Sequence, residues 1–215
     1  MNKIDWKNHL VELVVVFIGI TAAFALNNWN EKNKEDKLEQ KYLRNLTIDL
    51  DKDITELNEL IEVLKVDTLA NNKVLNLLKL GKTKKDSIFP LIIRMNTISK
   101  FQPHLTTFES LENSGDLSLI ENFELKNKIT ETYNFYKTVK EIDDAHYTLA
   151  FNYWLPFFYE NLDFMNLNNS KMYFIETQKF KNLIIIYRAS IFQQIARYDS
   201  ALTKCKKLKS AIKDN

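Results

Sequence analysis

The chain has 215 residues, enough for one good hydrophobic core, and its net charge is +2, from 30 Lys and Arg against 28 Asp and Glu. This balance provides no overall field that would attract nucleic acid, so we expect no nucleic-acid partner. The chain has only 3 Gly and 3 Pro. Sheets and long loops need such turn residues, so their scarcity predicts an all-α fold.

The first predicted element follows a short N-terminal flank, residues 1–9. Residues 10–26 read LVELVVVFIGITAAFAL, about 26 Å of helix, which is at the short end of what crosses a bilayer. Tryptophans lie on both sides of this run, where membrane interfaces favour them, and asparagines end it. We therefore predict a transmembrane helix at residues 10–29. Its interface collar would be Trp6, Asn27, Asn28, Trp29 and Asn30.

Two other interpretations of this segment remain open. Lys3 and Lys7 fit the basic start of a cleavable signal peptide, and Ala23-Phe24-Ala25 fits its cleavage pattern. Glu12 lies inside the apolar run and argues against that interpretation. A buried helix of a soluble core is the third alternative.

Small residues on the apolar segment form a candidate association face. Gly19 and Ala23 make a small-xxx-small pair, with Ala22 beside them, and such residues let two membrane helices approach closely. The alternative is that Gly and Ala are simply common in membrane helices. Glu12 either reaches the nearby interface, with His9 as a hydrogen-bond partner, or contacts a partner helix.

A long helix is expected over about residues 31–80, beginning with the dense mixture of charges at residues 31–41. Apolar residues then recur at spacings of three and four, which places them on one helical face. They are Leu43, Leu46, Leu50, Ile54, Leu57, Ile61 and Leu64. The stripe indicates either the core of a bundle or a juxtamembrane coiled coil between protomers. We expect a break in the helix at Asp67-Thr68.

Short helices are expected over about residues 88–120. Gly81-Lys82-Thr83 lacks the earlier glycine and the strand of a phosphate loop, so Gly81 is interpreted as a helix C-cap. One short helix is expected after Pro90, and another is expected to be capped by Thr106 or Thr107. Gly115 is predicted to be left-handed, at the turn that follows.

Two more long helices are predicted at about residues 122–161 and 176–213, separated by a loop at 163–170. Together with the first they favour an antiparallel bundle in a helical soluble domain spanning residues 30–215. An aromatic cluster at a proline kink is either a ligand pocket or a heavy core. Its members are Tyr153, Trp154, Phe157 and Phe158. Cys205 lies on the apolar face of the last helix, as expected of a small buried residue.

Catalytic and metal-binding patterns are missing from the sequence. The three histidines are His9, His104 and His146, and none belongs to a Glu-x-x-His pair. His146 has Asp143 three residues earlier, yet the simpler interpretation is a surface histidine. The remaining acidic residues look like charged solvent faces. We therefore predict no cofactor, no metal and no enzymatic activity, and the sequence names no small-molecule ligand.

Two stretches resemble a known family. HLVELVVVFIGITAAFALNNWNE (His9 to Glu31), followed by YLRNLTIDLDKD (Tyr42 to Asp53), resembles the start of a widespread family of uncharacterised single-span bacterial membrane proteins. TTFESLENSGDLSLIENFELKNKITETYNFY (Thr106 to Tyr136) resembles its second block. That family is a domain of unknown function, so the resemblance implies architecture and no activity. It points to Glu12, Asn27, Asn28, Trp29, Asn30, Glu31 and Gly115 as positions to test.

The resemblance also implies a bacterial inner-membrane location with a cytoplasmic N-terminus. Here only Lys3 and Lys7 precede the span, and more basic residues follow it, which by simple counting places the bundle in the cytoplasm. Long domains, however, translocate largely regardless of charge, so we expect a periplasmic bundle.

The leading hypothesis is a non-enzymatic, membrane-anchored accessory or scaffold subunit of an envelope complex. It would assemble through its span and juxtamembrane helix, as a homo-oligomer or with a membrane-protein partner. The alternative is a membrane-anchored sensor or ligand-binding bundle. An enzyme of unfamiliar type is the third hypothesis.

Overall fold

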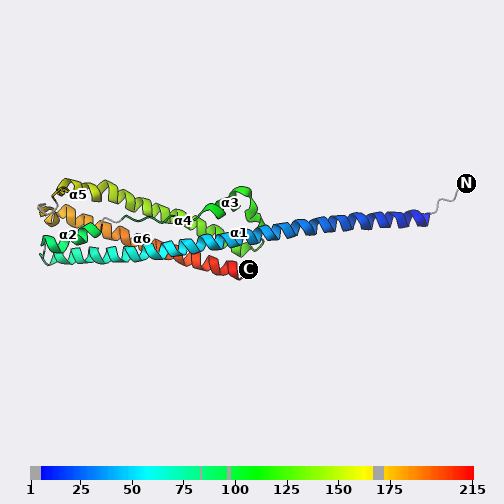
Figure 1. Cartoon of the computed structure of the whole chain (residues 1–215), viewed down its shortest axis with the longest axis horizontal. Helices are drawn as coiled ribbons and strands as arrows, with labels where there is room; N and C mark the ends of the chain where they lie inside the picture. The colour runs from blue at the N-terminus through cyan, green and yellow to red at the C-terminus, as the bar shows by residue number, and fades with distance from the viewer. Residues whose placement is uncertain (1–5, 83, 96–97, 167–171) are drawn as a thin grey trace.

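The structure is a computed structural model that describes residues 6–82, 84–95, 98–166 and 172–215, with the backbone alone at residues 6–9. Within these ranges the chain is helical and contains no strand. Figure 1 shows one very long helix, α1, whose N-terminal part projects alone and whose remainder packs into a bundle with α4 and α6. The all-α prediction is thereby confirmed.

Helix α1 (Trp6–Lys79) is continuous for 74 residues, about 110 Å at 1.5 Å per residue. No Gly or Pro occurs between Gly19 and Gly81, so nothing in the backbone favours a stop. The predicted break at Asp67-Thr68 was wrong. The Thr68 hydroxyl donates to the Leu64 carbonyl at 2.9 Å within the helix, and the Asp67 side chain is buried against α2.

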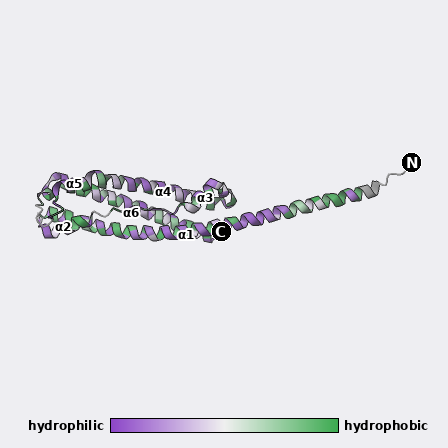
Figure 2. Cartoon of the chain, turned by 45° about the horizontal axis from the view of Figure 1, so that its top comes forward, coloured by the Kyte–Doolittle hydropathy of each residue, from purple (hydrophilic) through white to green (hydrophobic). Residues whose placement is uncertain are grey.

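Three consecutive parts of α1 have different surroundings. Residues 10–29 are exposed and mostly apolar, and residues 30–41, which we call the stalk, are polar and mostly exposed (Figure 2). From residue 42 onward one face is buried. The predicted stripe packs inside this single chain, against α6 above all, and Leu46, Leu50 and Leu57 are fully buried. The stripe therefore forms part of the bundle core, which was one of the two alternatives. No coiled coil between protomers is needed to bury these residues.

Helix α1 ends in a left-handed turn, and the chain returns as α2 (Lys85–Arg94). Gly81 has φ +65°, and the Lys82 N–H donates to the Leu77 carbonyl at 2.9 Å, which together terminate the helix as predicted. The expectation that α2 starts after Pro90 was wrong, because Pro90 lies inside it. Ile88 and Ile92, on either side of this proline, are fully buried, so packing against α1 holds the turn together.

Residues 98–105 have no regular secondary structure and lead to α3 (Thr106–Ser114) at the stalk end of the bundle. The expected side-chain cap at Thr106 or Thr107 was wrong: Leu105 is the N-cap residue, and the Thr107 hydroxyl donates instead to Asp49 on α1. The prediction for Gly115 is confirmed, with φ +79° at the C-cap. A short 3-10 turn, η1 (Asp116–Leu119), follows.

Helix α4 (Phe123–Leu149) begins at an Asn122 cap, whose side chain accepts the Leu125 N–H at 3.1 Å. It passes into a π-helical turn, η2 (Ala150–Trp154), and then α5 (Leu155–Asn161). The π turn lies directly before Pro156, which has no N–H to donate. The predicted helix therefore continues to residue 161. Where a kink was expected, it contains a π-helical turn, whose hydrogen bonds span five residues instead of four.

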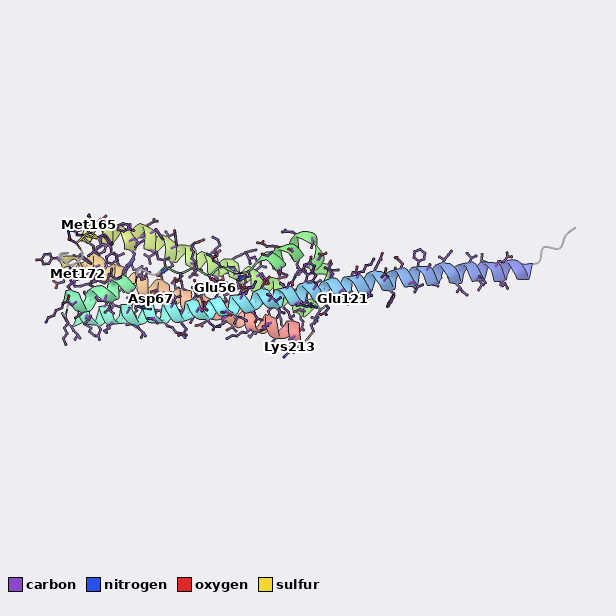
Figure 3. All side chains as sticks on the ribbon, viewed as in Figure 1. Glu56, Asp67, Glu121, Met165, Met172 and Lys213 are labelled. Atoms are coloured by element: carbon purple, nitrogen blue, oxygen red, sulfur yellow. The ribbon has the colours of Figure 1, made fainter. Side chains whose placement is uncertain are left out.

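A 3-10 turn, η4 (Tyr173–Glu176), precedes α6 (Gln178–Lys213), which the Thr177 hydroxyl caps by accepting the Phe180 N–H. Part of the predicted loop at 163–170 lies outside the described residues. Helix α6 runs antiparallel to α4, because Asn122 at the start of α4 donates to Asn215 while His146 near its end contacts Ser190. Figure 3 accordingly places Lys213 and Glu121 at the stalk end and Met165 and Met172 at the far end.

Candidate functional site

The irregular segment at residues 98–105, which we call the strap, lies between helices α1 and α4. Its backbone N–H groups are held by side chains rather than by a sheet. The Phe101 N–H donates to Asp143 at 3.1 Å, and the Gln102 N–H donates to Glu56 at 2.9 Å. The His104 N–H donates to Asp53 at 2.9 Å. Carboxyl groups from two different helices thus fix a stretch of chain that has no regular structure of its own.

Asp143 is the anchor of the strap on α4. It is 2% exposed, and besides the Phe101 N–H it accepts the Tyr198 hydroxyl at 2.6 Å and the Gln194 amide at 2.9 Å. Burial raises the pKa of the Asp143 carboxyl, while these hydrogen bonds act in the opposite direction. Asp143 therefore links α4, α6 and the strap at one point.

Asp53 is the corresponding anchor on α1 and is fully buried. It accepts the Tyr136 hydroxyl at 2.7 Å, and the same oxygen that holds the His104 N–H also contacts His104 Nδ1 at 2.8 Å. Because the single Tyr136 proton points to Asp53, the Cys205 thiol is the donor in its 3.0 Å contact with the Tyr136 oxygen. Burial raises the pKa of this thiol to about 11, which makes it a poor nucleophile.

A cleft opens between the strap, α3 and α4, with a volume of about 450 Å³. Its lining is mostly apolar and aromatic: Phe101, Pro103, Leu105, Phe108, Tyr133 and Tyr136. The rings of Phe108 and Tyr133 stack with centroids 4.4 Å apart, so the cleft has a firm wall. Tyr133 is 2% exposed, and its hydroxyl has no hydrogen-bond partner among the described residues. This volume and lining are typical of small-molecule sites.

Charged side chains surround the opening of the cleft. On the α4 side, Lys100 and Lys140 both pair with Asp144, so these two cations share one carboxylate. On the α3 side stand Glu109 and Glu112, which are exposed and form no ion pair within the described part of the chain. At one end of the cleft, therefore, two lysines are paired with a carboxylate, and at the other end two glutamates have no cationic partner within the described residues.

The aromatic cluster singled out from the sequence lies elsewhere, in the part of the bundle far from the stalk. Trp154, Phe157 and Phe158 are buried, whereas Tyr153 is 61% exposed and does not share their surroundings. Their rings pack against Phe174, Phe180 and Tyr187. Three of the four residues therefore belong to a densely packed aromatic core, which was the expected alternative to a ligand pocket.

His146 was expected at the surface, and that expectation was wrong, because the residue is 2% exposed. Its Nδ1 lies 2.8 Å from the Ser190 hydroxyl, which itself donates to the Tyr187 carbonyl, so Nδ1 carries the histidine proton. Burial lowers its pKa to about 4. Asp143, although three residues earlier, bonds to other groups. His9 lies outside the described side chains, as does Trp6.

The burial of Asp53 and Asp143 was not predicted, because the acidic residues were expected on solvent faces. Asp53 lies three residues after Leu50 and four before Leu57, so it occupies the apolar face of α1. Asp143 stands four residues after buried Val139 in the same way. Charges at core spacing were the signal that could have identified both residues.

The predicted association residues lie on the projecting apolar part of α1. At 100° per residue, Glu12, Gly19 and Ala23 fall within about 40° of one another around the helix, and Ala22 is further round. Gly19 has open space around it, with nothing within 4 Å of where a Cβ would stand. A shallow apolar groove runs on another side, lined by Phe17, Ile18, Thr21, Ala22 and Ala25. In the interface collar, Trp29 is 69% exposed, and Asn27, Asn28 and Asn30 are also exposed.

Together these observations define an all-α chain with one helix, near its N-terminus, that is long and apolar enough to cross a membrane, followed by a helical bundle. In the described residues no group of three His, Cys, Asp or Glu side chains is placed to hold a metal ion.

A model described as a family of unknown function (DUF6090) matches residues 12–190, so the chain belongs to that family. This match confirms the resemblance to an uncharacterised family. Comparison with curated proteins and with solved structures gave no match.

Proposed function

We propose that the protein is a non-enzymatic, membrane-anchored accessory or scaffold subunit of a bacterial envelope complex, with its bundle in the periplasm. The observation that carries this proposal is the continuity of α1, a single helix that includes the apolar segment, the stalk and the bundle core. A partner held by the apolar segment would therefore be coupled rigidly to the bundle.

The length of α1 indicates what such a subunit would do. From Asn30 to Lys79 it extends about 75 Å beyond the apolar segment, so the far end of the bundle stands well away from the membrane surface. Near the membrane, Lys32 on the stalk pairs with Glu121 in the connection before α4, which supports the base of the bundle. A rod of this shape suits a spacer or organising subunit.

Assembly would occur through the face that carries Glu12, Gly19 and Ala23. Small residues allow a second helix to approach closely in lipid, and Glu12 would supply a polar contact near the interface. The partner is either a second copy or the helix of another membrane protein.

The test is native mass spectrometry of the protein extracted in mild detergent from its own membrane. A defined homo-oligomer or a stable co-purifying protein supports the proposal, and a monomer without a partner contradicts it. Ala23→Leu should abolish assembly by crowding the predicted face. Ala25→Leu is the matched control, because the same change lies about 160° away around the helix. If Ala25→Leu abolished assembly and Ala23→Leu did not, the association face would be the groove that includes Ala25 and not the predicted face.

A second candidate function is a ligand-binding bundle. The observation in its favour is the aromatic cleft between the strap, α3 and α4, rather than the aromatic cluster expected from the sequence. Binding there would alter the surroundings of the strap, which contacts α1 directly.

A further inference from the structure

We infer that the cleft between the strap, α3 and α4 binds a small organic cation with an apolar, ring-sized body. This inference rests on the second candidate function and names the class of its ligand. It does not depend on how the chain is anchored or assembled, since every residue involved belongs to the bundle.

The apolar part of the ligand follows from the lining of the cleft. Aromatic and aliphatic side chains make up most of the exposed surface inside it, and Phe101 packs edge-on against Tyr136 at 5.3 Å between ring centroids. A volume of about 450 Å³ corresponds to about fifteen water molecules at about 30 Å³ each, so the ligand would have a similar number of non-hydrogen atoms. One or two rings with a short side chain fit this size.

The positive charge of the ligand is inferred from the two glutamates at the α3 end of the cleft. Glu109 and Glu112 lie one turn apart on α3, both line the cleft, and neither has a cationic partner in the described residues. Burial raises the pKa of the Tyr133 hydroxyl, and the nearby charges of Asp53 and Asp49 raise it further, which places both carboxylates behind the same wall of the cleft. An ammonium group would offset this concentration of negative charge.

The opposite choice, an anionic ligand, is less favoured by the remaining charges. Lys100 and Lys140 both pair with Asp144, whereas Lys137 is exposed and has the neutral Asn134 side chain, not a carboxylate, as its acceptor. A carboxylate ligand would compete with Asp144 for the same two lysines and would leave the two glutamates uncompensated.

The strap gives this cleft a fixed shape. Its Phe101 and Gln102 N–H groups are bonded to Asp143 and Glu56, which holds the Phe101 and Pro103 side of the cleft in place before any ligand arrives. Such preorganisation lowers the entropic cost of binding.

The experiment compares three probes that share an indole ring: tryptamine with an ammonium group, tryptophol with a hydroxyl and indole-3-propionate with a carboxylate. Binding is measured by isothermal titration calorimetry to the full chain in phosphatidylcholine nanodiscs, and the heat from empty nanodiscs is subtracted. We expect tryptamine to bind about fivefold more tightly than tryptophol, the factor given by an ion pair at a partly exposed site, and indole-3-propionate to bind most weakly.

The variant Glu109→Gln/Glu112→Gln should remove the preference for tryptamine and leave tryptophol binding unchanged. The control variant Glu124→Gln/Glu141→Gln makes the same change in net charge at exposed positions of α4 outside the cleft, and should behave as the original chain. Circular dichroism of each variant checks that the fold is intact.

The outcomes separate the inference from the function on which it rests. If tryptophol or indole-3-propionate binds as tightly as tryptamine, the cleft is a binding site but the cationic class is wrong. An equal loss of tryptamine binding in the cleft and control variants would also overturn the cationic class. If none of the probes saturates the protein at about 1 mM, both the inference and the ligand-binding function are contradicted.

Discussion

The carboxyl group of Asp143 accepts the backbone N–H of Phe101 at 3.1 Å, joining a buried position of α4 to an irregular segment 42 residues earlier in the chain. The same carboxyl group also holds Tyr198 and Gln194 of α6. Because Asp53 and Glu56 of α1 bond to the same segment from the other side, the strap joins α1 to α4.

Asp143→Ala is expected to destabilise the bundle by about 3 kcal/mol, because three buried donors lose their acceptor at once. The free energy of unfolding is measured by urea titration followed by circular dichroism in detergent. Asp144→Ala is the control: its carboxyl group is partly exposed and pairs with lysines, so a much smaller loss of stability is expected than for Asp143→Ala. Equal effects of the two substitutions would show that Asp143 does not anchor the strap.

Stability is expected to fall between pH 6.5 and pH 4 because of His146. Its pKa is about 4 in the folded chain against an ordinary value of 6.5, so in this window the unfolded chain binds a proton that the folded chain does not. The stabilising contribution is complete above pH 6.5, and the loss approaches about 3 kcal/mol at pH 4.

His146→Asn should flatten this part of the stability profile, as measured by urea titration at a series of pH values. Burial raises the pKa of Asp143 and Asp67, so these groups take up protons more readily when folded and act in the opposite direction as pH falls. The quantity to compare is therefore the difference in the free energy of unfolding between the variant and the original chain at each pH. A difference that does not vary with pH would contradict the assignment to His146.

Gly115→Ala is expected to cost about 1 kcal/mol, since φ of +79° is strained for a residue with a Cβ. No atom lies within 4 Å of the added Cβ, so the cost comes from the backbone alone. Asn tolerates the left-handed region better, and Gly115→Asn should therefore cost less than Gly115→Ala. Thermal unfolding of the two variants gives the order, and the reverse order would argue that φ is not the cause.

The proposed periplasmic location predicts that protease added to intact spheroplasts cleaves the bundle. Basic residues on the stalk do not prevent this topology, because long domains translocate largely regardless of charge. A cytoplasmic marker protein in the same sample must remain intact. Protection of the bundle until the spheroplasts are lysed would place it in the cytoplasm instead.

The sequence predicted the parts of the fold that depend on local rules. The apolar stripe from Leu43 to Leu64, the turn at Gly115 and the buried position of Cys205 all follow from helical spacing or from backbone conformation. The contacts of the strap could not be predicted in this way. They join residues more than 40 positions apart, such as Phe101 and Asp143, and depend on how helices meet in space.

The cleft could not be predicted from the sequence for the same reason, whereas the aromatic cluster proved to be the core that was one of its two expected alternatives. Trp154, Phe157 and Phe158 lie within five consecutive residues, which made them conspicuous, but packing against α6 and η4 buries them. The cleft is instead assembled from three separate elements whose residues show no pattern along the chain.

The proposed anchoring requires that residues 10–29 remain part of the chain and hold it in the membrane. The most direct measurement is the intact mass of the protein recovered from membranes washed with alkaline carbonate. We expect the protein to stay with the washed membranes and to have a mass that includes the apolar segment. Release into the wash, or a mass showing cleavage after Ala25, would contradict the proposed anchoring.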